Sequence, residues 1–299
     1  MNDLVDRVAV VTGAGSGIGR SIALALAAAG CDVVVADIDF DSASEVADQV
    51  RRHGRKAIAL RVDVADRDSM FALADHVYEE LGSVDVLVSN AGVTLRPFRT
   101  IWDASDDDWN WIMGVNFFGV VHGIQAFVPR MLAQAGPKHI VITSSVAPWL
   151  AIGGHGPYTA SKAAVDGLSA SLRAELEHTE VGLTLLLPGH VTTGLATTER
   201  LRPEKQRSEN RHIRAYELPA VLDREGEGNR PEAGSPVSEA PLSASHRPIE
   251  PDQVGPMVVD AILANRPFCL THPAPEEEID DHVARLKAGY AGRPSPDLG

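Results

Sequence analysis

Short apolar runs rich in β-branched residues alternate with longer amphipathic stretches along most of the chain. The apolar runs predict strands near 7–12, 32–38, 56–62, 84–88, 138–143, 181–187 and 268–271. The stretches between them predict helices, with long ones near 105–131 and 158–178. This alternation is typical of right-handed βαβ units. We therefore expect an α/β fold of the Rossmann type: one domain with a doubly wound, seven-stranded parallel sheet and helices on both faces.

A glycine-rich segment joins the first expected strand to the first expected helix. Thr12–Gly19 reads TGAGSGIG and places Gly13, Gly17 and Gly19 in a G-x-x-x-G-x-G pattern. Glycines permit a tight turn and a close approach to phosphates, and the helix start offers free N–H groups. The segment, with Ser16 and Ile18, predicts a dinucleotide site. A plain turn is the alternative for any single glycine cluster.

Asp37 ends the second expected strand, eighteen residues after Gly19. A carboxylate at this point can accept hydrogen bonds from both adenosine ribose hydroxyls and repels a 2′-phosphate. Neither Ile38 nor Asp39 supplies a cation that would neutralise such a phosphate. The sequence predicts NAD rather than NADP as cofactor, against the alternative of a solvated strand end.

Tyr158 and Lys162 stand four residues apart, and Ser145 lies thirteen residues before the tyrosine. A spacing of four puts the phenol and the ammonium on one helix face. A neighbouring cation lowers the pKa of a phenol, which can then exchange a proton with an alcohol or a ketone. A surface helix pair is the alternative while the spacing stands alone.

Together these motifs resemble the short-chain dehydrogenase/reductase family, over about 5–195 and more loosely over 250–272. The resemblance implies catalytic roles for Asn116, Ser145, Tyr158 and Lys162. The positions that it places against the cofactor, besides those named above, are Asp63 and Val64 near the adenine, Asn90, Ala91 and Gly92 after the fourth strand, and Pro188, Gly189, Val191 and Thr193 near the nicotinamide. Tyr158 and Lys162 also bind the cofactor in this scheme, and no metal is implied.

Each implied role has a physical basis. Ser145, preferred over Ser144, polarises the substrate oxygen, and Tyr158 is the general acid/base. Lys162 lowers the pKa of Tyr158 and bonds the nicotinamide ribose, while Asn116 holds a water that links Lys162 to solvent. Hydride moves between the substrate carbon and the nicotinamide.

The expected function is therefore NAD-dependent interconversion of a secondary alcohol and a ketone on a hydrophobic, aromatic or cyclic small molecule. A looser resemblance, around Trp109–Asn116 and Leu270–Pro273, points to a bacterial subgroup that includes aryl-alcohol Cα-dehydrogenases. Two alternatives are a catalytically silent NAD-sensing protein and an epimerase or dehydratase of the same fold. Sensors commonly lose the Tyr or the Lys, and epimerases usually carry a larger carboxyl-terminal substrate domain.

The pattern divides the chain into four segments. These are the dinucleotide-binding and catalytic core (1–195), a substrate-lid region with a Pro-rich insert (196–250), the last helix and strand (251–272), and an acidic helix with a tail (273–299). About 198–220 is expected to close over the substrate. Seven of the nineteen prolines lie between Pro203 and Pro251, so 225–248 is expected to be a loosely packed or disordered surface insertion.

Several side chains near the expected site carry weaker hypotheses. Trp149, Leu150 and Phe98 are candidates for an apolar pocket wall, and His155 is either a substrate contact or a loop residue. The tryptophans assigned to helix packing or subunit contacts are Trp102, Trp109 and Trp111.

Composition narrows the class of partner. A formal charge of −14 and a pI near 5.2 argue against nucleic acid and anionic membranes. The two cysteines suggest no disulfide framework, and the eleven histidines show no metal-ligand spacing. We find no secretory pattern and no apolar stretch approaching ~18 residues, which favours a cytoplasmic protein without a membrane span.

A homodimer or homotetramer is also expected. The long helices near 105–131 and 158–178 are the candidate dimer surface. Many family members end in Val-Asp-Gly-Gly after the last strand, whereas this chain has Leu-Thr-His-Pro there. That departure puts the usual tetramer contacts in doubt.

Overall fold

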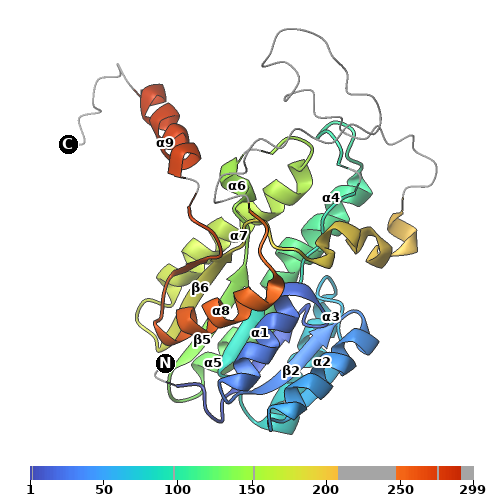
Figure 1. Cartoon of the computed structure of the whole chain (residues 1–299), viewed down its shortest axis with the longest axis vertical. Helices are drawn as coiled ribbons and strands as arrows, with labels where there is room; N and C mark the ends of the chain where they lie inside the picture. Colours follow the sequence, from blue (N-terminus) through green and yellow to red (C-terminus); the bar gives the residue numbers. More distant parts are fainter. Residues whose placement is uncertain (2, 97, 151, 208–246, 275, 291–299) are drawn as a thin grey trace.

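The computed structural model describes residues 1, 3–96, 98–150, 152–207, 247–274 and 276–290 (Figure 1). The expected insert at 225–248 therefore lies outside the described residues except for its last two positions. The same holds for 208–220 of the expected lid and for the tail after residue 290.

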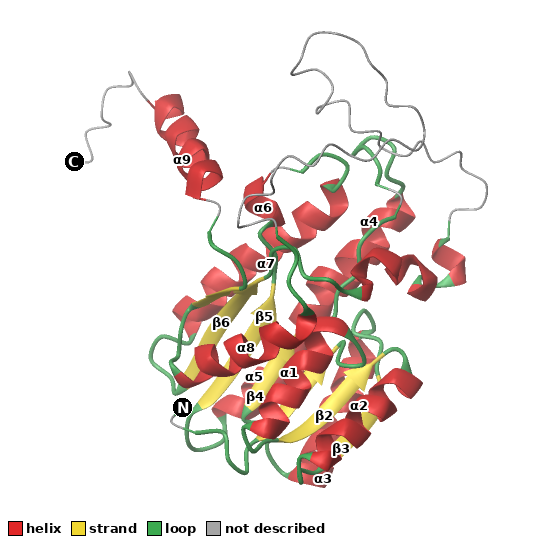
Figure 2. Ribbon diagram, viewed as in Figure 1, coloured by secondary structure: helices red, strands yellow, loops and turns green. Residues whose placement is uncertain are grey.

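Seven parallel strands form one sheet at the centre of the molecule (Figure 2). They are β1 (Val8–Thr12), β2 (Asp32–Asp37), β3 (Ala57–Arg61), β4 (Val86–Ser89), β5 (Lys138–Thr143), β6 (Val181–Leu187) and β7 (Phe268–Leu270). Their order is β3-β2-β1-β4-β5-β6-β7, and every pairing is parallel. The expected doubly wound Rossmann-type sheet is confirmed.

Helices cover both faces of this sheet and bury two separate cores. One core packs against α1 (Gly17–Ala28), α2 (Phe40–Arg52) and α8 (Val254–Leu263). The other packs against α3 (Arg67–Leu81), α5 (Gly119–Leu132) and α7 (Gly156–Glu175). Ala9 and Val11 face the first core, whereas Val8 and Val10 face the second. Burial on both faces is why the strand sequences are continuously apolar rather than alternating.

The expected long helix near 105–131 consists of three pieces. A capping box between Ser105 and Asp108 starts α4 (Asp106–Met113), and a π-helical turn, η1 (Gly114–Phe118), joins it to α5. The stretch 106–133 is long and apolar enough to cross a membrane by length and composition alone. Half of its most apolar window is buried inside the protein, where α5 packs against α3 and β4, so it serves here as a core helix.

The remaining described segments lie around the carboxyl ends of the strands. They are the short helix α6 (Ala147–Leu150), the 3-10 helices η2 (Gly194–Leu201), η3 (Glu204–Gln206) and η7 (Pro251–Gln253), and the helix α9 (Glu276–Tyr290). The start of the expected lid is therefore a pair of 3-10 helices rather than an α-helix. The acidic α9 extends away from the sheet beside α6 (Figure 1).

Candidate active site

A cavity opens at the carboxyl ends of the strands, where the strand order reverses between β1 and β4. Such a switch point is where open α/β sheets bind ligands. Every residue that the sequence assigned to the cofactor lines this one cavity. Of the four expected catalytic residues, Ser145, Tyr158 and Lys162 line it and Asn116 does not.

Backbone geometry explains the glycines of the loop between β1 and α1. Gly13 has a φ of +62°, and a Cβ there would lie 2.7 Å from the Cα of Ala91. A Cβ on Gly19 would lie 2.1 Å from the carbonyl oxygen of Gly13. Only glycine permits both the left-handed turn and this close packing. The loop therefore holds the amino end of α1 toward the cavity, as an anion site requires.

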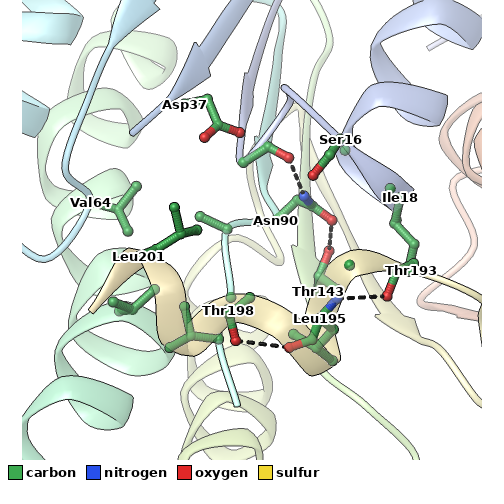
Figure 3. Close-up of a pocket in the computed structure, with 18 of the residues that line it drawn as sticks. Ser16, Ile18, Asp37, Val64, Asn90, Thr143, Thr193, Leu195, Thr198 and Leu201 are labelled. Carbon is green, nitrogen blue, oxygen red and sulfur yellow. Dashed lines mark hydrogen bonds between the residues drawn. The ribbon is translucent and has the colours of Figure 1, made fainter. Parts of the chain in front are cut away.

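Asn90, directly after β4, holds the glycine loop in place through hydrogen bonds of its side chain. Its Nδ2 donates to the carbonyl oxygens of Thr12 and Gly13, at 3.1 and 3.3 Å. Its Oδ1 accepts from the hydroxyl of Thr143 at 3.3 Å (Figure 3). Asn90 thus ties the ends of β1 and β5 together across β4, which fixes the floor of the cavity.

Asp37, the last residue of β2, lines the cavity at that strand's end (Figure 3). One carboxylate oxygen accepts from the backbone N–H of Gly15 at 2.8 Å, and the other from that of Asp39 at 3.0 Å. The glycine loop thus fixes the side chain, which presents negative charge to this end. Arg200 of η2 also lines the cavity, and its charge acts on Asp39. The sequence prediction considered only positions 38 and 39 and so missed Arg200, which is distant from Asp37 along the chain.

Tyr158 and Lys162 lie on the first turns of α7. The ammonium of Lys162 is 5.9 Å from the centre of the Tyr158 ring, and it donates to the carbonyl oxygen of Thr143 at 2.8 Å. The hydroxyl of Ser145 accepts from the backbone N–H of Ala147 at 3.1 Å and lies close enough to the Tyr158 phenol to lower its pKa. Three polar groups therefore converge on one wall of an otherwise apolar cavity end.

Burial shifts the pKa values of Tyr158 and Lys162. It raises the pKa of the Tyr158 phenol, and the bond with Ser145 offsets only part of the rise. It lowers the pKa of the Lys162 ammonium to about 8, against the attraction of Asp166. Burial is therefore the largest influence on the pKa of Tyr158 in this structure, and the lowering of that pKa by Lys162 stays a prediction.

Asn116 lies in the π-helical turn and is fully buried. Its Oδ1 accepts from the backbone N–H of Val93 at 2.8 Å, while its Nδ2 donates to the carbonyl of Val93 and the hydroxyl of Ser161, both at 3.0 Å. The amide therefore joins the loop after β4 to α7. Both Nδ2 hydrogens are used in these bonds, so the side chain helps to position α7, and the role of Asn116 in holding a water stays a prediction.

Ser144 and Ser145 point to different partners. The Ser144 hydroxyl donates toward Asp166 and the carbonyl of Lys162, both on α7. That bonding anchors α7 to the end of β5. Ser145 is the serine whose hydroxyl meets the Tyr158 phenol.

The Pro188–Gly189 loop has a support that sequence reasoning missed. Thr271 accepts from the backbone N–H of Gly189 at 3.0 Å, and its hydroxyl pairs with Nδ1 of His272 at 2.7 Å. A Cβ on Gly189 would lie 2.6 Å from that ring nitrogen. The Leu-Thr-His-Pro segment therefore supports the expected nicotinamide loop, a role that its sequence did not indicate.

The apolar walls of the cavity differ from those expected. Trp111 and Val115 contribute from α4 and η1, and Leu195, Thr198 and Leu201 from η2 (Figure 3). The side chains expected at this wall, Phe98, Trp149 and Leu150, do not line it, nor does His155. Trp111 packs in a small core with Val93 and Ile112, as expected of a helix-packing residue, and it also lines the cavity.

Among the described residues, no group of three or more His, Cys, Asp or Glu side chains is placed to hold a metal ion. Ser16, Gly17 and Gly19 at one end and Tyr158 and Lys162 at the other suit an elongated ligand with a phosphate part and a reactive part.

Comparison with known proteins agrees with this geometry. The family model for short chain dehydrogenases matches residues 7–204. A Cα-dehydrogenase of Sphingobium sp. strain SYK-6 is 31% identical over 288 residues, covering 96% of this chain and 87% of the relative. A fluoren-9-ol dehydrogenase of Terrabacter sp. strain DBF63 is 37% identical over 204 residues, covering 63% and 57%.

A solved structure matches nearly the whole fold. The crystal structure of a short-chain dehydrogenase/reductase from Burkholderia phymatum in complex with NAD has a TM-score of 0.83 and 35% identity, covering 97% of each chain. The family model covers the glycine loop, the first six strands and the Ser-Tyr-Lys wall, all within residues 7–204. This protein therefore belongs to the short-chain dehydrogenase family and is an oxidoreductase.

Proposed function

We propose that this oxidoreductase interconverts a secondary alcohol and a ketone with NAD as cofactor. One observation carries the proposal: Ser145, Tyr158 and Lys162 line the same cavity as the glycine loop and Asp37. A dinucleotide whose pyrophosphate meets the start of α1 would extend its nicotinamide toward the Ser-Tyr-Lys wall. When bound, the nicotinamide supplies a hydride donor or acceptor.

The residues of the wall divide the remaining work. Tyr158 takes the alcohol proton during oxidation or gives a proton to the ketone during reduction. Ser145 bonds the substrate oxygen and holds it against the phenol. Lys162 places positive charge beneath the ring, and its link to Thr143 fixes that position. Oxidation of an alcohol releases a proton and reduction of a ketone consumes one, so we expect oxidation to gain as pH rises.

Proton exchange with solvent was assigned to a water held by Asn116. The Asn116 amide is engaged with Val93 and Ser161, so such a water would bind main-chain groups of the π-helical turn instead. A π-turn inserts one residue into the helix and disturbs the regular backbone bonding, which makes main-chain groups available.

The substrate is proposed to be apolar and cyclic or aromatic. Trp111, Val115, Leu195 and Leu201 supply apolar surface at the cavity. Two relatives are named for cyclic alcohols, the fluoren-9-ol dehydrogenase and a 1-deoxy-11-beta-hydroxypentalenate dehydrogenase. NAD is proposed over NADP because the Asp37 carboxylate is held in place at the adenosine end.

A direct assay tests the proposal. Purified protein is mixed with NAD⁺ and a panel of aryl carbinols, fluoren-9-ol and aliphatic secondary alcohols, and NADH absorbance is followed. We expect turnover of aryl or cyclic alcohols and little of short aliphatic ones. Binding of NADH without turnover of any alcohol or of the matching ketones would contradict the proposal and favour the sensing alternative.

The oligomeric state is proposed to be a homodimer or homotetramer. Phe118 and Leu132, at the two ends of α5, are about half exposed and give this helix apolar surface. Sedimentation velocity measures the state directly, and a monomer at micromolar concentration would contradict the proposal.

A further inference from the structure

A buried cluster of charges lies behind the cavity wall. Asp108 on α4 is 1% exposed and contacts two guanidinium groups, those of Arg99 and Arg202. The contact with Arg202 is 2.7 Å long. Glu199 of η2 lies 3.6 Å from both arginines and closes the cluster at its more exposed side. We call these four residues the ionic latch.

The ionic latch joins segments that are distant in sequence. Arg99 belongs to the loop after β4, Asp108 to α4, and Glu199 and Arg202 to η2 and its end. These are the segments that supply most of the apolar cavity wall. The ionic latch is also connected to the start of α7. The backbone N–H of Arg99 donates to the carbonyl oxygen of Gly154 at 3.3 Å, and Arg99 forms a β-bridge with His155, three residues before Tyr158.

Two further contacts lie between the same segments. Thr198 of η2 accepts from the backbone N–H of Thr94 at 3.1 Å and also contacts its carbonyl oxygen at 3.2 Å. The guanidinium of Arg202 lies 5.2 Å from the ring of Trp111, a cavity residue. The latch therefore sets the distance between Trp111 on one side of the cavity and η2 on the other.

General stability is a poor explanation for this arrangement. Burying two arginines and an aspartate costs desolvation energy, and apolar side chains of similar volume often replace such groups without loss. Several nitrogens of the two guanidinium groups have no hydrogen-bond partner among the described residues. Contacts between a guanidinium and a carboxylate do have preferred distances and directions, which contacts between apolar side chains lack.

We propose that Asp108 is a positioning residue for the proposed reaction: through Arg99 and Arg202 it holds η2 over the cavity before a ligand binds. The two arginines repel each other, and the Asp108 carboxylate offsets that repulsion at the buried side of the cluster. Removing its charge frees η2 to open. This inference rests on the proposed function for the identity of the ligand but not for the closure of η2.

Opening of η2 has a defined kinetic signature. If only a fraction of the molecules is closed, the apparent dissociation constant is the constant of the closed form divided by that fraction. Ligands therefore bind more weakly. Saturating ligand restores the closed form, so kcat is preserved while KM rises. A purely structural loss would instead lower the melting temperature without changing KM.

The chain provides a matched control. Asp85, at the amino ends of the strands, is 5% exposed and also contacts two cations, Arg7 at 3.2 Å and Lys138 at 3.1 Å. Asp85→Asn and Asp108→Asn therefore make the same chemical change in the same kind of cluster at opposite edges of the sheet.

The experiment measures amide hydrogen exchange of 194–202 in the protein without ligand, followed by KM and kcat. Asp108→Asn should speed exchange in this segment and raise KM for cofactor and alcohol at least about fivefold, with kcat changed less than about twofold. Asp85→Asn should lower the melting temperature and leave both the exchange and KM unchanged. Unchanged exchange in Asp108→Asn, or equal acceleration in both variants, would overturn the proposal.

A milder variant covers the case in which Asp108→Asn fails to fold. Glu199→Gln alters the partly exposed end of the ionic latch, and its exchange and KM should rise by roughly two- to threefold. Wild-type exchange in that variant would also overturn the proposal. A latch variant with fast exchange in a protein that turns over no alcohol would instead reject the proposed function alone.

Discussion

The ammonium of Lys162 lies 5.9 Å from the centre of the Tyr158 ring and is held there by the carbonyl oxygen of Thr143, 2.8 Å away. The anchor belongs to the end of β5, so the sheet itself fixes where the positive charge lies under the phenol. The spacing of four residues places Tyr158 and Lys162 on one helix face. The bond to Thr143 then fixes the position of the ammonium along that face.

Tyr158→Phe should remove turnover because it deletes the only group of the residue that exchanges a proton. We expect kcat to fall by at least roughly 10²- to 10⁴-fold, the usual contribution of a general acid or base. NADH affinity, measured by fluorescence titration, should change little, since the ring still packs over Lys162.

Tyr78→Phe is the matched control for that variant. Tyr78 is also partly buried, on α3, and burial raises the pKa of its phenol to about 12. Its hydroxyl has no hydrogen-bond partner among the described residues. Loss of that hydroxyl should leave kcat unchanged. Near-normal kcat in Tyr158→Phe would remove this residue from the proposed mechanism.

Asp37→Ala should shift coenzyme preference toward NADP(H). The change removes a fixed negative charge and leaves Arg200 lining the cavity, so a 2′-phosphate meets less repulsion. We expect the ratio of kcat/KM for NADP(H) to that for NAD(H) to rise at least about tenfold, or roughly 1.4 kcal/mol.

Asp41→Ala provides the control for net charge. Asp41 is exposed on the first turn of α2, so its loss changes the charge of the protein by the same amount at a position outside the cavity. The coenzyme ratio should stay at the wild-type value. If Asp37→Ala leaves the ratio unchanged as well, selectivity arises elsewhere, with Arg200 as the first residue to examine.

Local patterns were enough to predict the sheet and much of the cavity. The strands are buried on both faces, so their sequences stay apolar throughout, and glycines mark the loop where a Cβ would collide. Gly13 comes directly after β1, Asp37 ends β2, and Tyr158 lies at the start of α7. Their positions along the chain therefore fix their positions at the carboxyl edge of the sheet.

The apolar wall could not be predicted in the same way. Leu195, Thr198 and Leu201 are placed by Thr94 and by the ionic latch, whose members are about a hundred residues apart. A single sequence carries no local signal for such contacts. The π-helical turn is a comparable case, since the periodicity near 105–131 fits an unbroken helix equally well.

Gly19→Ala should abolish cofactor binding. The new Cβ would lie 2.1 Å from the carbonyl oxygen of Gly13 and 2.5 Å from Nδ2 of Asn90, and both of those atoms are fixed by the loop. Either the glycine loop or the start of α1 must shift away. NADH titration should show a loss of affinity of at least about 100-fold, or roughly 2.7 kcal/mol.

Gly167→Ala on α7 makes the same substitution where there is space. Its Cβ would have nothing within 4 Å, and alanine favours a helix interior by about 0.5–1 kcal/mol over glycine. Binding of NADH should be unchanged and the melting temperature slightly raised. Normal affinity in Gly19→Ala would show that the loop is not the phosphate site.

His139 on β5 gives the fold a pH dependence that is independent of catalysis. It is 1% exposed, and its Nε2 lies 2.8 Å from the hydroxyl of Thr184, which donates its own proton to the carbonyl of Arg266. Nε2 therefore donates a hydrogen to the Thr184 hydroxyl. Burial lowers the pKa of His139 to about 4 from an ordinary value of 6.5.

The sign of the effect follows from which state binds the proton. Between pH 6.5 and 4 the unfolded chain protonates this histidine and the folded protein does not, so the free energy of unfolding falls as pH drops. A shift of this size corresponds to roughly 3 kcal/mol, fully expressed below the folded-state pKa. His139→Gln keeps a donor toward Thr184 without a titrating group, so urea unfolding from pH 7 to 4 should show a flatter curve. The exposed His178→Gln should follow the wild type, and a wild-type slope in His139→Gln would place the acid sensitivity at another group.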